Sequence, residues 1–159
     1  EIALQGVGKY KDFDVVDASK ENADLGEVSD EEKAEADAAK EAYKATTEYL
    51  KSVLGSRVDK VEVSARLEES PSALVQPQWG MSPQMQRFMR AQAAAQGNED
   101  AMMAGMAANL EINPKHPVVT RLQAMVGDGG DATSPAATGF SELLYDVAAV
   151  ASGYELTNP

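Results

Sequence analysis

Lys60-Val-Glu-Val-Ser-Ala-Arg-Leu67 is the stretch in which the spacing of apolar residues changes from three or four to two. Successive side chains of an extended chain point to opposite faces, so Val61, Val63, Ala65 and Leu67 would share one face. Charged and hydroxyl residues alternate with them. The stretch therefore predicts a half-buried strand. The helical patterns on both sides of it predict an α+β domain with a small mixed sheet.

A long helix is predicted directly before this strand. Ser29 and Glu32 match the Ser-x-x-Glu capping box, whose side chains satisfy free amides at a helix start. Gly55 is typical of the left-handed residue that ends a helix. Between these signals, apolar residues recur every three or four positions and form one stripe for a core: Ala39, Ala42, Tyr43, Thr46, Leu50, Val53 and Leu54.

Further strands and helices are predicted after residue 67. Residues 68–71 should turn the chain, so that residues 73–75 form a partner strand in a hairpin or small sheet. Leu110 and Ile112 indicate another short strand. Proline after a capping residue marks helix starts at Ser82-Pro83 and at His116-Pro117. A last helix is expected over about residues 135–152, after a glycine-rich loop and before Gly153.

The composition favours one main acidic domain. The chain has 159 residues, of which 43% are apolar, and a formal net charge of −12. That charge would repel phosphate backbones and anionic lipid, so nucleic acid and membrane surfaces are poor partners. Residues 11–48 hold thirteen Asp or Glu against five Lys, which is typical of a solvated helix face. The absence of Cys excludes disulfides and thiolate metal sites and fits a reducing compartment.

We divide the chain into residues 1–28, an extended tail and acidic linker, and residues 29–159, the main domain. The sequence begins at Glu1 in the middle of a pattern and ends at Pro159 shortly after a helical pattern. We therefore expect a fragment of a larger protein.

Residues suited to catalysis or cofactor binding are scarce. The lone His116 at a helix start is more often a cap or surface residue than a catalyst. Gly6-Val7-Gly8 lacks the third glycine of a dinucleotide fingerprint, and no phosphate-binding loop motif occurs. Asp128 and Asp131 lack the pattern of a calcium loop. We predict no catalytic residue, no metal site and no cofactor for this segment.

Two apolar patterns are more informative. Trp79 precedes a helix on which Met81, Met85, Phe88 and Met89 share one face. Flexible thioether side chains suit a surface that accepts varied partners, although an ordinary core is the commoner explanation of such a stripe.

The last helix is apolar on most sides. One face carries Phe140, Leu143, Leu144, Val147, Val150 and Ala151, and Tyr145, Ala148 and Ala149 extend the apolar cover. Such a helix must be buried either inside its own domain or against a second subunit, and the pattern alone leaves both open.

Four segments together resemble the C-terminal domain of the heat shock protein 90 chaperone family. They are Lys60–Leu67 with Ser70-Pro71, Gly80-Met-Ser-Pro-Gln-Met-Gln-Arg-Phe-Met-Arg-Ala-Gln92, Leu110-Glu-Ile-Asn-Pro-Lys-His-Pro117 and Leu143-Leu-Tyr-Asp-Val-Ala-Ala-Val-Ala-Ser-Gly153. They occur in the family's order and cover most of residues 58–159. Residues 9–25 are similar to the end of the family's middle domain. The residues Gly80-Met81-Ser82 favour a bacterial or organellar branch of the family.

The resemblance implies a stress-response chaperone that folds clients as an ATP-driven homodimeric clamp. ATP and magnesium would bind an N-terminal domain outside this segment. Trp79, Met81, Met85, Phe88 and Met89 become candidates for client contact. The dimer-interface candidates are Phe140, Leu143, Leu144, Val147, Val150 and Ala151. The implied partners are a second copy, unfolded client proteins and co-chaperones, in the cytoplasm, a mitochondrion or a plastid.

In the family a further helix normally follows the position of Pro159 and completes the dimer bundle, so this chain would carry half of the interface. The alternative function is a passive structural domain, whose Met face and last helix would both be buried internally. A tight monomer would favour that reading, whereas self-association favours the chaperone reading.

Overall fold

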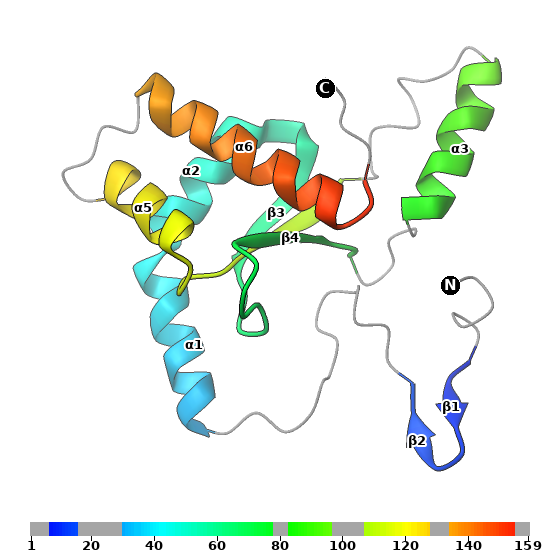
Figure 1. The fold of residues 1–159 in the computed structure, drawn as a ribbon, viewed down its shortest axis with the longest axis horizontal. Helices are drawn as coiled ribbons and strands as arrows, with labels where there is room; N and C mark the ends of the chain where they lie inside the picture. Colours follow the sequence, from blue (N-terminus) through cyan, green and yellow to red (C-terminus); the bar gives the residue numbers. More distant parts are fainter. Residues whose placement is uncertain (1–6, 16–29, 78–82, 97–106, 128–133, 155–159) are drawn as a thin grey trace.

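A computed structural model of the chain describes residues 7–15, 30–77, 83–96, 107–127 and 134–154 (Figure 1). The elements are β1 (Lys9–Tyr10), β2 (Phe13–Asp14), α1 (Asp30–Ala42), α2 (Lys44–Leu54), the 3-10 turn η1 (Gly55–Arg57), β3 (Val58–Val63), β4 (Ser72–Val75), α3 (Pro83–Gln96), β5 (Ala108–Ile112), α5 (Pro117–Val126) and α6 (Pro135–Ala151). The predicted α+β class with a small mixed sheet is confirmed.

The main sheet has the strand order β3-β5-β4. β5 runs parallel to β3 and antiparallel to β4, and Leu110 is paired with Val61 on one side and with Leu74 on the other. The predicted small sheet is therefore confirmed, but direct pairing of residues 60–67 with residues 73–75 is wrong. All five residues of β5 are buried, including the polar Asn109 and Glu111, in agreement with its central position between the two.

The predicted strand around residue 61 is shifted toward the N-terminus. β3 begins at Val58, has an irregular register between Val58 and Val61, and ends at Val63. Val61 and Val63 pack against the core as expected, whereas Ala65 is exposed and the polar Ser64 is buried. The alternation stops at Ser64 because its amide donates to the Ile112 carbonyl at 2.8 Å and its hydroxyl belongs to a polar network.

The predicted long helix is divided in two. Tyr43 separates α1 from α2 with φ −99° and ψ 6°, and its buried hydroxyl donates to the Pro114 carbonyl at 2.7 Å. This contact ties the junction of α1 and α2 to the loop before α5. Gly55 ends α2 at a φ of +55°, as predicted from the sequence. Ser29 lies outside the described residues.

One hydrophobic core lies where α2, α5 and α6 pack against one another and against the sheet (Figure 1). Its fully buried members include Leu50 of α2, Leu110 of β5 and Leu122 of α5. The start of α5 follows the predicted capping chemistry, and α6 begins in the same way although no cap was predicted there. The His116 Nδ1 accepts from the Val118 amide at 3.2 Å, and the Ser134 hydroxyl accepts from the Ala136 amide at 3.3 Å.

Candidate functional site

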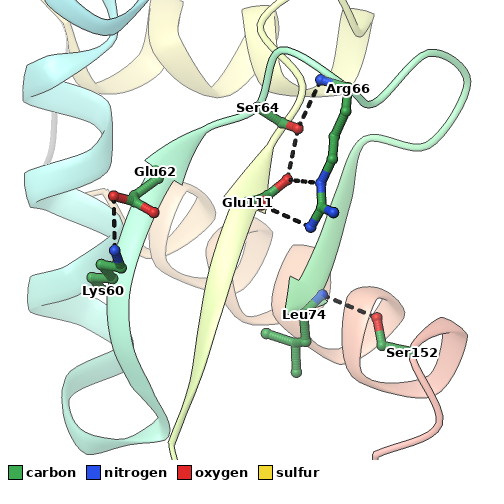
Figure 2. Close-up of polar contacts among 7 residues, drawn as sticks. All are labelled: Lys60, Glu62, Ser64, Arg66, Leu74, Glu111 and Ser152. Carbon is green, nitrogen blue, oxygen red and sulfur yellow. Dashed lines mark hydrogen bonds and ion pairs between the residues drawn. The ribbon is translucent and has the colours of Figure 1, made fainter. Parts of the chain in front are cut away.

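The helix α6 lies on the edge strand β4 and is fixed there by two serine hydroxyls. Ser72 Oγ donates to the Leu144 carbonyl at 3.1 Å. The Leu74 amide donates to Ser152 Oγ at 3.0 Å (Figure 2). Small side chains on the inner side of α6, Ala137, Ser141 and Ala148, are completely buried. These contacts fix the rotation of the helix about its own axis.

The opposite side of α6 carries large apolar side chains in solvent. Leu143 is 60% exposed, Val147 49% and Val150 62%. Their spacing of four and three residues places them on one line along the helix. Ala136, Gly139 and Ala151 are also exposed. We call Leu143, Val147, Val150 and Ala151 the α6 outer face.

Of the six predicted interface residues, Leu144 does not lie on this face, and Phe140, three residues before Leu143, is only partly available there. Leu144 is 3% exposed and belongs to the core cluster, so it is not available to a partner. Phe140 is partly buried and packs against the same core. Successive residues of a helix are rotated by about 100°, which places Leu144 on the side of Ser141 and Ala148 rather than that of Leu143. Grouping Leu144 with Leu143 on one face was therefore wrong.

A charged border runs along the α6 outer face. Arg57 Nη2 lies 3.3 Å from Glu142 Oε1, and the Arg57 guanidinium lies 5.3 Å from the centre of the Tyr145 ring. Both charged side chains are partly exposed. The sequence did not predict this contact, because it joins residues 85 positions apart.

The predicted client-contact helix is present as α3, Pro83–Gln96, and stands apart from the sheet and the other helices in Figure 1. Phe88 is 65% exposed, Met85 46%, and Met89 partly buried. Trp79 and Met81 lie outside the described residues. The exposed Phe88 and Met85 mean that this face is not an ordinary core stripe within the described part of the chain.

A polar network of Ser64, Arg66 and Glu111 lies at one end of the main sheet. The Glu111 carboxylate accepts two hydrogen bonds from Arg66, from Nε to Oε2 and from Nη2 to Oε1, both at 2.9 Å (Figure 2). Ser64 Oγ donates to Glu111 Oε2 at 2.7 Å. Asn113, also buried, donates from Nδ2 to the carbonyls of Glu68 and Ser70. The sequence pattern placed Arg66 on a polar strand face but gave no signal for its partner Glu111 in β5.

A second buried polar group lies beyond the end of α6. Gly153 has a φ of +79°, and the following Tyr154 amide returns to the Ala149 carbonyl at 2.8 Å. The Tyr154 ring packs against the core, and its buried hydroxyl makes no hydrogen bond with the described residues. Burial, and to a smaller extent the neighbouring Tyr145, raises the pKa of Tyr154 to about 12.

Within the described ranges, no three His, Asp or Glu side chains lie close enough together to hold a metal ion. The described helices also fall short of the length and apolar character that crossing a bilayer requires. Large apolar side chains are exposed on α6, on α3 and in residues 10–15 of the β1–β2 hairpin. Such surfaces are typical of proteins that act by binding other proteins.

Comparison with known proteins gives the family. The chain matches the family described as Hsp90 protein over residues 1–159, and it therefore belongs to the Hsp90 family. It is 38% identical to heat shock protein 90-5, chloroplastic, of Arabidopsis thaliana over 159 residues, 20% of that protein. It is 35% identical to heat shock protein 90-6, mitochondrial, of the same plant, and 38% identical to the chaperone protein HtpG of Burkholderia lata. All of the chain is covered in these matches, and it spans about a fifth of the relatives' length.

Proposed function

We propose that residues 29–159 form the C-terminal pairing domain of an Hsp90-family chaperone, preceded by the end of the middle domain and a linker in residues 1–28. The observation that carries this proposal is the α6 outer face. Three large apolar side chains of a helix that otherwise belongs to the core are about half or more exposed. Contact with a second copy would remove them from water, which favours association in proportion to the buried apolar area.

Pairing of this chain alone should be weak. Stable protein interfaces bury about 1,200 Å² or more, and one helix face on each copy supplies only part of that area. The relatives are about five times as long as this chain. We therefore expect a concentration-dependent dimer, to which further parts of a longer polypeptide would add contacts.

The exposed face of α3 is proposed as a contact for client proteins. Phe88 and Met85 are accessible, and Met89 is partly so. Methionine side chains adapt to irregular apolar partners, as holding of partly folded proteins requires. In this proposal ATP hydrolysis takes place elsewhere in the longer chaperone. The relatives' chloroplast, mitochondrial and bacterial names suit an organelle or the cytoplasm as the compartment.

The pairing proposal is tested by sedimentation of the chain over a wide concentration range. The double substitution Leu143→Ser with Val150→Ser should abolish dimer formation, because it makes the α6 outer face polar without touching the core. Phe88→Ser on α3 is the matched control and should leave dimerisation unchanged. Far-UV circular dichroism checks that the fold persists. If the unsubstituted chain is monomeric at every concentration, the passive structural domain replaces the pairing domain.

The assignment to the C-terminal part has its own test. Titration with Mg-ATP should give no binding heat, since we propose that nucleotide binds another domain. Saturable nucleotide binding would instead place the segment in a nucleotide-binding part of the chaperone and overturn the assignment.

Client contact is tested with an aggregating model protein. Met85→Ser with Phe88→Ser should reduce the suppression of its aggregation, whereas Leu143→Ser should affect pairing more than suppression. Equal protection by the α3 variant and the unsubstituted chain would contradict the client role of this helix.

A further inference from the structure

Arg57 is held against α6 from outside that helix. It is the last residue of η1, and its side chain reaches Glu142 at 3.3 Å and the Tyr145 ring at 5.3 Å. A guanidinium that pairs with a carboxylate and lies against an aromatic ring is oriented by both contacts. The positive charge of Arg57 is therefore fixed beside the α6 outer face.

The same border of α6 is otherwise acidic. With about 100° between successive residues, Glu142 and Asp146 lie one turn apart on the same side of the line through Leu143 and Val147. Asp146 is partly buried, and Glu142 is exposed. Without Arg57, this border would present two carboxylates and no fixed cation from η1.

Antiparallel pairing of two α6 helices through the outer face would bring this border into contact with a second copy of itself. A two-fold interface is formed by the same surface on both copies, and in antiparallel pairing the same border lies on the same side of both helices, so each charge meets the charges of an identical border. Each chain also carries a net charge of −12, which opposes association. A border with both signs can complement itself, whereas a purely acidic border repels its copy.

We infer that Arg57 is a specificity-determining residue for self-pairing. It neutralises Glu142 within its own chain and offers a positive charge to the acidic border of the second copy. This inference rests on the proposed pairing through the α6 outer face and names the residue that permits an acidic chain to pair there.

The inference predicts a particular dependence on salt. Charges at a rim are screened within about 10 Å at 0.1 M salt and about 3 Å at 1 M salt. Arg57→Gln should therefore weaken dimerisation about three- to tenfold at low salt, with little difference from the unsubstituted chain at about 1 M salt. A role of Arg57 in packing alone would weaken pairing equally at both salt concentrations.

The experiment is sedimentation equilibrium of five forms of the chain at low and high salt. Arg57→Lys keeps the charge and should pair within about twofold of the unsubstituted chain. Arg57→Gln with Glu142→Gln should recover pairing, because the uncompensated carboxylate is gone. Lys40→Gln is the matched control. It makes the same charge change in an exposed ion pair with Asp37 on α1 and should leave pairing within about twofold.

The outcomes separate this inference from the proposed function. Unchanged dimerisation of Arg57→Gln at low salt, or a loss that neither salt nor Glu142→Gln relieves, would overturn the role of Arg57 and leave the pairing face intact. An equal effect of Lys40→Gln would show that net charge alone matters, and would also overturn it. Monomers in all five forms would overturn pairing itself.

Discussion

Replacement of Arg66 by Met should destabilise the fold more than substitution of an exposed residue such as Leu143 or Lys40. The Glu111 side chain is 10% exposed and the Arg66 side chain 22%, and two hydrogen bonds of 2.9 Å join them. Without Arg66, the Glu111 carboxylate still accepts the hydrogen bond from the Ser64 hydroxyl. Its negative charge, however, has lost the positive partner in a largely buried site. Removing one partner of such a pair costs about 3–5 kcal/mol.

Urea denaturation followed by far-UV circular dichroism measures this loss. The midpoint should fall while the slope stays constant, and the melting temperature should drop by roughly 6–20 °C for a domain of this size. Replacing both partners, Arg66→Met with Glu111→Leu, should recover most of the stability, because no charge is then left buried. A loss below about 1 kcal/mol for Arg66→Met alone would refute the view that this pair is shielded from solvent.

Three other substitutions test the core and its buried polar groups by the same unfolding assay. Leu144→Ala should cost about 2–5 kcal/mol, whereas Leu143→Ala should change monomer stability by less than about 0.5 kcal/mol; similar losses would contradict the rotation of α6. Thr46→Val should stabilise the fold by about 1 kcal/mol, because the buried Thr46 hydroxyl makes no hydrogen bond with the described residues, and destabilisation would reveal a partner. Burial raises the pKa of Tyr154 to about 12 in the folded chain, above the ordinary value of about 10 that it has in the unfolded chain. The neutral Tyr154 side chain therefore stabilises the fold fully below pH 10, and this stabilisation is lost as pH rises from 10 through 12. Tyr154→Phe should reduce that alkaline loss in melts across this pH range, and an identical pH profile would rule out Tyr154 as its source.

Local patterns in the sequence predicted the elements, but not all of their partners. Gly55, His116 and Gly153 mark helix ends through backbone and capping chemistry that acts over a few residues, and each of these predictions is confirmed. The position of β5 between β3 and β4 depends on contacts between segments about 35 to 50 residues apart. Spacing along one strand contains no information about that order.

The sequence predicted that the candidate site is a helix, but not which side of this helix faces solvent. An α6 that is apolar on most sides can be rotated in several ways, and the sequence pattern grouped Leu144 on one face with Leu143. Side-chain size decides between the rotations. The close contact of α6 with the edge of β4 requires small residues such as Ser141 and Ala148, and hydrogen bonds at Ser72 and Ser152 fix the result.

The division of α6 by side-chain size also bears on its function. If burial in its own domain were the only constraint on this helix, solvent-facing positions would gain nothing from Leu143, Val147 and Val150. Polar residues there would keep the helix equally well on the sheet and would reduce exposed apolar area. Ala137, Ser141 and Ala148 face the sheet together with Leu144, whereas Leu143, Val147 and Val150 face outward in a line bordered by Arg57 and Glu142. This arrangement favours a helix with two contact faces, one for its own domain and one for a second copy.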